Sequence, residues 1–222
     1  MNILMITPYV TIASRPELSI NKTGFGYMVY DIANAVSKKE KVEVLCSDSL
    51  GESFEDDGVH YLKRSLLSFL KYIPKCLSFG IIIKILIRYR LQYKTTLRLF
   101  YYWMMTGYIS RLINCDSYDI VHIHGCGFST ELWMQVCKRC NQKFVVTLHG
   151  LNSFSDRIRL EPAGIQYERD FLRRVVDGKI HITVISTGMK KIIERTYNTP
   201  DCKYITVVCN SFSFNEMRKG GL

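Results

Sequence analysis

The sequence predicts an α/β fold built on a doubly wound, mainly parallel sheet of the Rossmann-like class. The first observation is that short β-branched runs alternate with helix-length segments along most of the 222 residues. The second is that two of these runs, 118–125 and 144–150, close on the same His-Gly pair and enclose a helix-length stretch at 128–140. Strands and helices that alternate with short loops favour parallel strands joined by right-handed crossovers.

The individual elements follow from hydrophobic periodicity and from the residues that interrupt it. The expected strands are 2–7, 42–46, 59–62, 118–125, 144–150, 180–185 and 204–209. The expected helices are 27–38, 84–98, 128–140, 165–176 and 188–197, the last with Ser186 or Thr187 as its N-cap. The acidic stretch 48–58 is predicted to be a turn region. One domain should cover residues 1–210, and 211–222 should be the start of an interdomain linker or a truncated end.

The N-terminus and the cysteines indicate a cytoplasmic protein. The first residues lack a basic n-region, and the chain has no stretch of eighteen uncharged apolar residues. We therefore expect neither a signal peptide nor a spanning helix. The eight cysteines are then expected to be reduced thiols. Cys137 and Cys140 form a lone CxxC without a second pair at zinc spacing, so no metal site is predicted.

The pattern of His122, His124 and Cys126 resembles a set of metal ligands, because alternate residues of a strand share a face. Gly125 interrupts the strand at this point and favours a loop. Buried or hydrogen-bonded side chains are therefore preferred to a metal site here.

The positive charge is concentrated in one segment. The formal net charge is +10, and residues 58–115 contain ten basic residues and no acidic one. If 84–98 is one helix, its five basic residues fall within roughly 160° of arc, opposite an apolar face. This basic amphipathic helical segment, 64–114, suits an anionic membrane surface. The membrane-contact candidates are Lys84, Arg88, Arg90, Lys94, Arg98 and Trp103.

This segment has two other interpretations. A helix that packs on the sheet and exposes a solvated basic face is the alternative to membrane contact. Nucleic acid is not expected as a partner, because the basic residues interleave with Ile, Leu and Tyr and flank no known reading motif.

A glycine pair lies where the first strand leads into the first helix. Gly24, Phe25 and Gly26 are predicted to belong to a loop whose backbone amides can approach a phosphate at the helix N-terminus. The spacing does not complete GxGxxG, because Val29 occupies the third position, so a dinucleotide-binding domain is disfavoured. An ordinary flexible turn is the alternative.

Polar residues follow several of the predicted strands. His149 is the candidate catalytic residue, because an imidazole at a strand end can hydrogen-bond a sugar hydroxyl or stabilise developing charge. A structural histidine is the alternative. His124, Gly125, Gly150, Ser186 and Asn210 are candidate binding residues at the same edge, since ligands of open α/β sheets lie at the carboxyl ends of the strands.

Four segments, 29–36, 118–125, 145–150 and 182–186, resemble the N-terminal half of a family 4 glycosyltransferase with the GT-B fold. The resemblance implies a retaining enzyme that moves a sugar from a nucleotide-sugar to an acceptor such as a cell-surface polysaccharide, a lipopolysaccharide or a lipid-linked saccharide. It implies that the N-terminal domain binds the acceptor and that a second domain binds most of the donor. The resemblance implies that the enzyme needs no cofactor, because the nucleotide-sugar is the donor substrate.

The resemblance also assigns roles to residues. Gly24 would approach the donor phosphate, and His149 would contact the transferred sugar near the reaction centre. Ser186 and Asn210 would match the polar residues that close the next two strands. The donor-binding half is expected to be missing, which predicts a chain that is inactive alone. The alternative is a non-catalytic half-enzyme, or binding module, that docks a separate donor-binding subunit.

Overall fold

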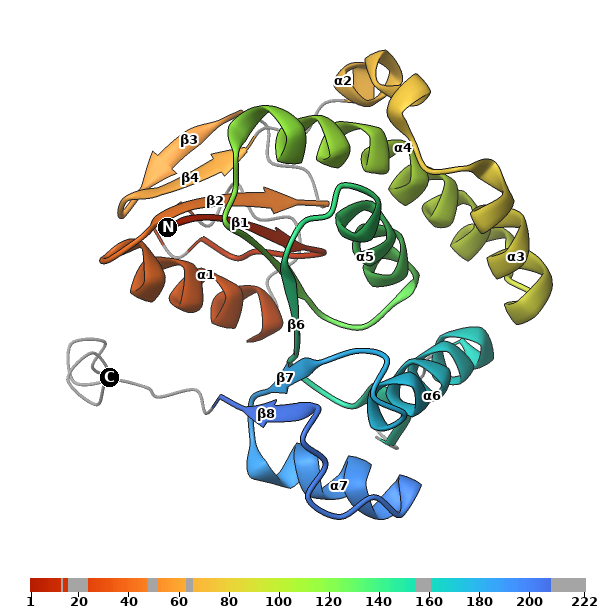
Figure 1. Cartoon of the computed structure of the whole chain (residues 1–222). Helices are drawn as coiled ribbons and strands as arrows, with labels where there is room; N and C mark the ends of the chain where they lie inside the picture. The colour runs from red at the N-terminus through yellow and green to blue at the C-terminus, as the bar shows by residue number, and fades with distance from the viewer. Residues whose placement is uncertain (13, 16–23, 48–51, 63–65, 155–160, 209–222) are drawn as a thin grey trace.

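The computed structural model describes residues 1–12, 14–15, 24–47, 52–62, 66–154 and 161–208. Within these ranges one sheet of eight strands carries the fold, in the order β3-β4-β2-β1-β5-β6-β7-β8 (Figure 1). Every neighbouring pair is parallel except β3 and β4, which are antiparallel. The predicted fold class, a doubly wound and mainly parallel sheet, is therefore confirmed.

The strands are β1 (Asn2–Thr7), β2 (Lys41–Cys46), β3 (Phe54–Asp56), β4 (Val59–Leu62), β5 (Ile120–His124), β6 (Phe144–Leu148), β7 (Ile182–Val184) and β8 (Ile205–Val207). The helices are α1 (Gly24–Ser37), α2 (Leu66–Lys71), α3 (Phe79–Tyr89), α4 (Tyr93–Asp116), α5 (Phe128–Arg139), α6 (Pro162–Val176) and α7 (Thr187–Tyr197). Two short 3-10 turns are η2 (Ile73–Lys75) and η3 (Asn152–Phe154).

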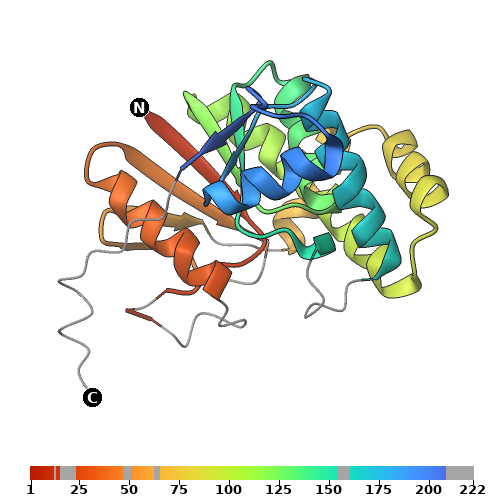
Figure 2. The same cartoon turned by 90° about the horizontal axis from the view of Figure 1, so that it is seen from below.

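Both faces of the central strands are buried, each in a hydrophobic cluster of its own. In β1, Ile3 and Met5 join the cluster that contains α1, whereas Leu4 and Ile6 join the cluster of α4, α5 and α6. Alternate residues of a strand point to opposite faces, so a strand covered on both sides must be apolar throughout. Figure 2 shows α1 on one side of the sheet and α6 on the other. This two-sided burial explains why β1 could be located from its apolar run.

The stretch 48–58 contains a strand as well as a turn. Phe54–Asp56 pairs antiparallel with β4 across Asp57 and Gly58, both of which have positive φ, 48° and 75°. A three-residue edge strand with two acidic residues has too little hydrophobic pattern to be recognised in sequence. Residues 48–51 lie outside the described residues; within 52–58, the predicted turn is present at Asp57 and Gly58, and residues 54–56 form the strand.

The prediction of one helix over 84–98 is wrong. α3 ends at Tyr89, and Arg90 takes a left-handed conformation with φ 48° while its N–H bonds the Leu86 carbonyl. Gln92 is extended, and the 24-residue helix α4 begins at Tyr93. The basic residues assigned to one amphipathic surface therefore belong to two helices with different surroundings.

Gly24 and Gly26 lie in the first turn of α1 and not in a loop. Gly26 is buried, and a Cβ added there would lie 2.9 Å from the Thr11 backbone nitrogen and closer still to the Thr11 hydroxyl. Gly24 is exposed, with no described atom within 4 Å of an added Cβ. The poor helix propensity of glycine favoured a loop, but close packing against Thr11 requires glycine inside this helix.

We expect Gly26→Ala to lower the free energy of unfolding by about 1–3 kcal/mol, because the methyl group overpacks against Thr11. Gly24→Ala is the matched control and should be neutral or stabilising by about 0.5–1 kcal/mol, because alanine favours the helix. Urea unfolding of both variants measures the difference. Equal effects of the two substitutions would contradict the packing role of Gly26.

Candidate functional site

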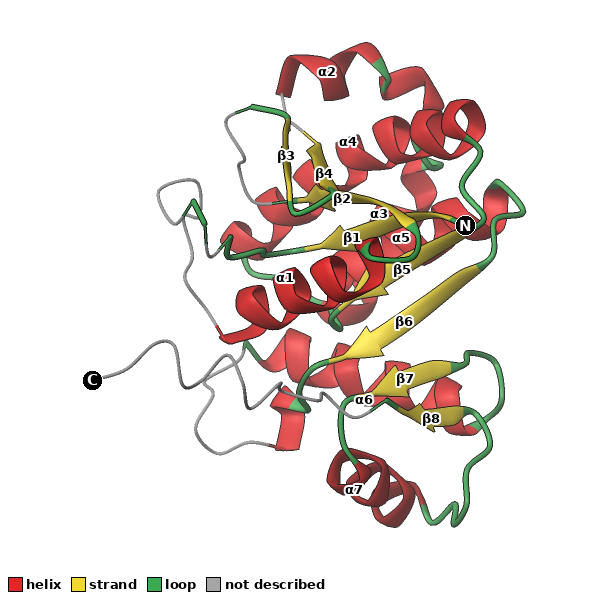
Figure 3. Cartoon of the chain, turned by 90° about the vertical axis from the view of Figure 1, so that its left-hand side faces the viewer, coloured by secondary structure: helices red, strands yellow, loops and turns green. Residues whose placement is uncertain are grey.

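The carboxyl ends of the parallel strands meet at one edge of the sheet, as Figure 3 shows for β1, β5, β6 and β7. At this end the α1-side face of the sheet becomes polar. Val121 and Ile123 of β5 point into the cluster of α4, α5 and α6, so His122 and His124 point to the opposite face. By the same alternation, Thr147 of β6 and Thr183 of β7 lie on that face. The apolar sheet therefore carries a polar stripe near the site.

Hydrogen bonds connect this polar stripe across three strands. His122 Nε2 lies 2.6 Å from Thr147 Oγ1, which lies 2.5 Å from Thr183 Oγ1. Thr183 Oγ1 donates to the Val146 carbonyl at 3.4 Å. A hydroxyl both donates and accepts, so two threonines can pass one hydrogen-bond chain from the imidazole to the backbone. The stripe is thereby satisfied inside the sheet.

His149 continues the stripe beyond the end of β6. Its Nε2 lies 2.9 Å from His124 Nδ1, so one of the two rings donates to the other. The ring of Phe25 in α1 meets His149 edge-on, with centroids 4.8 Å apart. His124 is fully buried and its ring also lies 3.9 Å from that of His122. His124 and Phe25 therefore hold His149 from two sides.

Burial keeps the three histidines neutral. It lowers the pKa of His122 and of His149 to about 4, with the nearby His149 adding to the effect on His122. Burial also lowers the pKa of His124 well below its usual value, and the two neighbouring rings lower it further. A neutral imidazole offers one donor and one acceptor. At neutral pH this site therefore provides hydrogen bonds without positive charge.

A cavity of about 680 Å³ opens beside His124. Its lining includes Pro8 and Tyr9, which follow β1, and Phe25 of α1. The remaining walls come from α4, from the β5–α5 connection and from the start of α6. His149 is not among the described residues that line this cavity, but it contacts two that are, His124 and Phe25.

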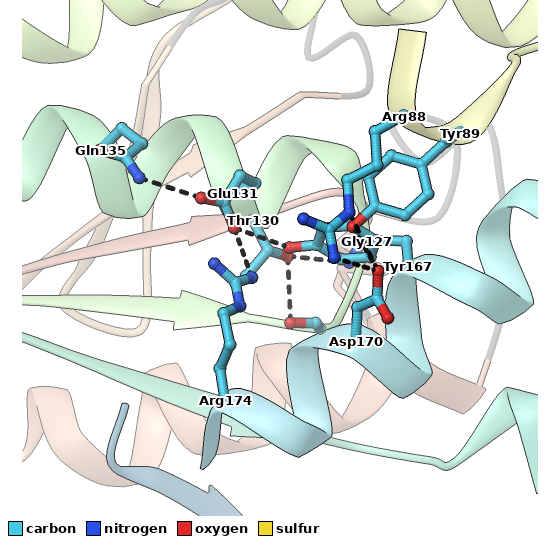
Figure 4. Close-up of polar contacts among 10 residues, drawn as sticks. Arg88, Tyr89, Gly127, Thr130, Glu131, Gln135, Tyr167, Asp170 and Arg174 are labelled. Carbon is cyan, nitrogen blue, oxygen red and sulfur yellow. Dashed lines mark hydrogen bonds and ion pairs between the residues drawn. The ribbon is translucent and has the colours of Figure 1, made fainter. Parts of the chain in front are cut away.

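The β5–α5 connection has a fixed geometry. Gly125 has φ 92°, a conformation that strains any residue with a Cβ. The Thr130 hydroxyl accepts from the Gly127 N–H at 3.2 Å and donates to the Gly125 carbonyl at 3.1 Å (Figure 4). The two glycines and Thr130 thus define the start of α5, whose first turn faces the cavity.

The first turn of α5 is anchored to α6. Glu131 lies 2.6 Å from Arg174 and accepts from Gln135 at 3.0 Å (Figure 4). Burial by itself would raise the pKa of Glu131, but the hydrogen bonds from Arg174 and Gln135 bring it below its usual value. This partly buried ion pair joins the two helices that line the cavity.

Glu168 of α6 anchors the segment that follows His149. Its two carboxylate oxygens accept from the Asn152 N–H at 3.0 Å and the Ser153 N–H at 2.6 Å. The side chain is buried, with only 2% of the residue exposed, and burial raises its pKa. This contact was not predicted from the sequence.

The structure brings together four of the predicted site residues and separates the others. Phe25, His124, Gly125 and His149 meet at the carboxyl edge of the sheet. Ser186 confirms the predicted N-cap of α7, because its Oγ accepts from the Met189 N–H at 3.2 Å. Gly24 and Gly150 are exposed, and Gly26 packs against Thr11. Asn210 lies outside the described residues.

The basic candidates have different environments. Arg88 binds Asp170 of α6 through two hydrogen bonds of 2.8 and 3.1 Å (Figure 4). Trp103 is half-buried and donates from Nε1 to the Leu77 carbonyl at 2.8 Å. Arg98 lines the cavity. Lys84, Arg90 and Lys94 are exposed.

Sequence reasoning did not predict Thr147, Thr183 or Glu168 as parts of the site. A signal existed for the threonines: His-Ile-His, Thr-Leu-His and Ile-Thr-Val place a polar residue at every second position of adjacent strands. Glu168 left no such signal, because only tertiary packing tells a buried glutamate from an exposed one on an amphipathic helix.

Among the described residues, no group of three or more His, Cys, Asp and Glu side chains is arranged to hold a metal ion. The seven cysteines within these ranges, Cys137 and Cys140 included, are free thiols. None of the described helices combines the length and the hydropathy needed to cross a bilayer.

Comparison with known proteins gives a family and a fold. The model of Glycosyltransferase Family 4 matches residues 23–213. Sucrose-phosphate synthase from Thermosynechococcus elongatus is similar in structure, with a TM-score of 0.59 and 10% identity over 97% of this chain and 49% of that one. A putative UDP-N-acetylglucosamine 2-epimerase from Listeria monocytogenes matches with a TM-score of 0.45 and 12% identity over 93% of this chain and 45% of that one. No curated relative matches in sequence. The chain spans about half the length of these structures.

Because the pKa of His122 is about 4 in the folded protein, the unfolded chain binds more protons between pH 4 and 6.5. We therefore expect the free energy of unfolding to fall as the pH is lowered from 7 to 5. His122→Asn should make this fall smaller by about 2 kcal/mol. His181→Asn, at an exposed histidine outside the polar stripe, is the control. Urea unfolding at pH 7 and pH 5 measures the free energy of unfolding of each variant. If it falls as much in His122→Asn as in the unsubstituted protein, the assignment is refuted.

Proposed function

Because this chain belongs to glycosyltransferase family 4, we propose that it is the acceptor-binding half of a retaining enzyme. The enzyme would move a sugar from a nucleotide-sugar to a cell-surface polysaccharide or a lipid-linked acceptor. The observation that carries the proposal is the meeting of Phe25, His124, Gly125 and His149 beside a cavity at the carboxyl edge of the sheet. Ligands of open α/β sheets bind at this edge.

His149 is the proposed catalytic residue. Its Nε2 is engaged with His124, and its Nδ1 is buried without a hydrogen-bond partner among the described residues. A buried polar atom without a partner is unfavourable, so a hydroxyl of the transferred sugar is a fitting ligand for Nδ1. A pKa of about 4 keeps the ring neutral, which suits hydrogen bonding to a sugar rather than charge pairing.

The donor is proposed to bind mainly through a second domain. GT-B enzymes bind the two substrates between two domains, and this chain spans about half the length of the similar synthase. Gly24 at the start of α1 is the proposed contact of the donor phosphate, because a helix N-terminus favours an anion. We accordingly propose that the chain alone does not turn over. The nucleotide-sugar is a substrate, and no cofactor is included in the proposal.

The enzyme is proposed to work at the inner face of a membrane, through a surface that differs from the sequence-based one. Eight of the twelve exposed large hydrophobic side chains of the described residues lie between residues 67 and 97. On α3 they form a stripe at every fourth position, Phe79, Ile83 and Ile87, with Ile87 73% exposed. Ile82 and Ile85, which belong to the apolar face opposite the basic residues, are buried in the core.

Charges flank this apolar stripe of Phe79, Ile83 and Ile87. Lys84 follows Ile83 in the sequence and is exposed, and the exposed Arg90 and Lys94 lie at the junction of α3 and α4. An exposed apolar face with Lys and Arg at its border suits the interface of an anionic bilayer. The proposed anchor is therefore the outer face of α3, and the inner face of the same helix is the part that packs on the protein.

We expect His149→Ala to lower kcat of the complete enzyme by about a hundredfold or more, because it removes a preorganised group at the reaction centre. The thermal midpoint should change little, since the ring is held at the edge of the core. His181→Ala is the control and should keep full activity. A glycosyl-transfer assay and a thermal melt are compared; equal losses of activity and stability would identify a structural histidine.

We expect Ile87→Glu to weaken binding to anionic vesicles by about tenfold, because it removes one buried apolar side chain from the interface. Ile192→Glu on α7 is the control and should have no effect, because Ile192 is also exposed, at 43%, but lies on a different helix. Co-sedimentation with anionic and neutral vesicles measures the binding, with duplex DNA at the same salt concentration as a competing polyanion. Binding to DNA with equal strength, or identical behaviour of both variants, would contradict the membrane proposal.

A further inference from the structure

The N-terminus of α5 faces the cavity without a side-chain cap. Gly127 is its N-cap and has no side chain to offer, and Phe128, Ser129 and Thr130 of the first turn line the cavity. The first amides of a helix have no acceptor within the helix, and the aligned peptide dipoles make this end positive. A twelve-residue helix of this kind favours an anion at its start.

A second, independent observation concerns His124. The residue is fully buried and lines the same cavity. Its Nδ1 is taken by His149, whereas its Nε2 has no hydrogen-bond partner among the described residues. Buried polar atoms of native proteins are normally paired, so a ligand oxygen in the cavity would complete the bonding of this ring.

The wall formed by α4 provides a cation. Thr95, Arg98, Leu99 and Tyr102 follow the spacing of one helical face, and all four line the cavity. Arg98 is the only Lys or Arg among the described lining residues. A guanidinium matches the geometry of a phosphoryl group because its donors form a rigid planar fork.

Two carboxylates in the lining are already engaged by donors of the protein. Glu161 accepts from the Gln92 N–H at 2.9 Å and from the Thr95 hydroxyl. Glu168 accepts from two backbone amides of the segment 152–153. Neither forms an ion pair with Arg98, so the guanidinium is not neutralised by the acidic residues of the same cavity.

The remaining walls are apolar. Six large hydrophobic or aromatic residues line the cavity: Tyr9, Phe25, Leu99, Tyr102, Phe128 and Tyr167. On the same helix as Arg98, Tyr93 and Leu97 are 75% and 50% exposed. Exposed apolar side chains therefore lie on the helix that carries the cation, outside the cavity.

We propose that this cavity binds an acceptor that joins a phosphoryl group to an apolar chain. The phosphoryl oxygens lie between the start of α5, His124 Nε2 and the Arg98 guanidinium, and the apolar chain lies on the aromatic walls and leaves along α4. The inference rests on the proposed function, because it specifies the acceptor of that site. Arg98, predicted from sequence to contact a membrane, becomes a substrate-binding residue.

Calorimetric titration of the purified protein with geranyl phosphate tests the assignment without any sugar transfer. Arg98→Gln should weaken binding by about ten- to a hundredfold, the loss expected for hydrogen bonds to a charged group. Lys138→Gln, at an exposed position of α5 outside the cavity lining, is the control and should change affinity less than twofold. Both side chains are exposed, so both variants should fold.

The probes separate the two parts of the ligand. Geraniol should bind weakly and equally to all three proteins, and glucose 6-phosphate should bind more weakly than geranyl phosphate. Unchanged affinity in Arg98→Gln would overturn the phosphoryl assignment. Equal affinity for geraniol and geranyl phosphate would do the same, and glucose 6-phosphate binding as tightly as geranyl phosphate would overturn the apolar part.

Failure of the proposed function gives a different result. Transfer by the complete enzyme to an uncharged acceptor, at a rate insensitive to Arg98→Gln, would refute this inference and leave the glycosyltransferase intact. Binding of geranyl phosphate that depends on Arg98, with no transfer from any nucleotide-sugar, would retain the site and refute the function.

Discussion

The hydrogen bond between His124 Nδ1 and His149 Nε2 joins two adjacent strand ends, and the geometry of the site depends on it. Both rings are held in a dehydrated place where a charged imidazole is unfavourable, so the pair must remain neutral to stay in position. Phe25 closes one side of His149, and the cavity opens on the side of His124. One contact thus sets the position of both rings at the carboxyl edge of the sheet.

Two acidic residues, the half-buried Glu131 and the buried Glu168, keep this arrangement in place from outside. Glu131 ties α5 to α6 through Arg174, and Glu168 ties α6 to the segment after His149. Neither touches the histidines. Their contribution is to hold the helices and the loop from which the cavity walls come, as expected of a site that must be rigid before its ligands bind.

The sheet was predictable because strands buried on both faces must be apolar along their whole length, and β1, β5 and β6 are. The site was partly predictable, since His149 and His124 follow such strands directly. The break at Arg90 was not, because the apolar periodicity runs on from α3 into α4, and only the left-handed backbone of Arg90 and the extended Gln92 separate the two helices. Gly26 was not predictable either, because the close approach of Thr11, which leaves no room for a Cβ, is a tertiary contact.

The stack of His122, His124 and His149 has one more consequence, for the response of the protein to acid. His149 adds to the burial that lowers the pKa of His122, and both neighbouring rings lower the pKa of His124 further. A proton on one of these neighbours therefore opposes a second proton on His122 or His124, and the stack stays uncharged until the solution is well below neutral pH.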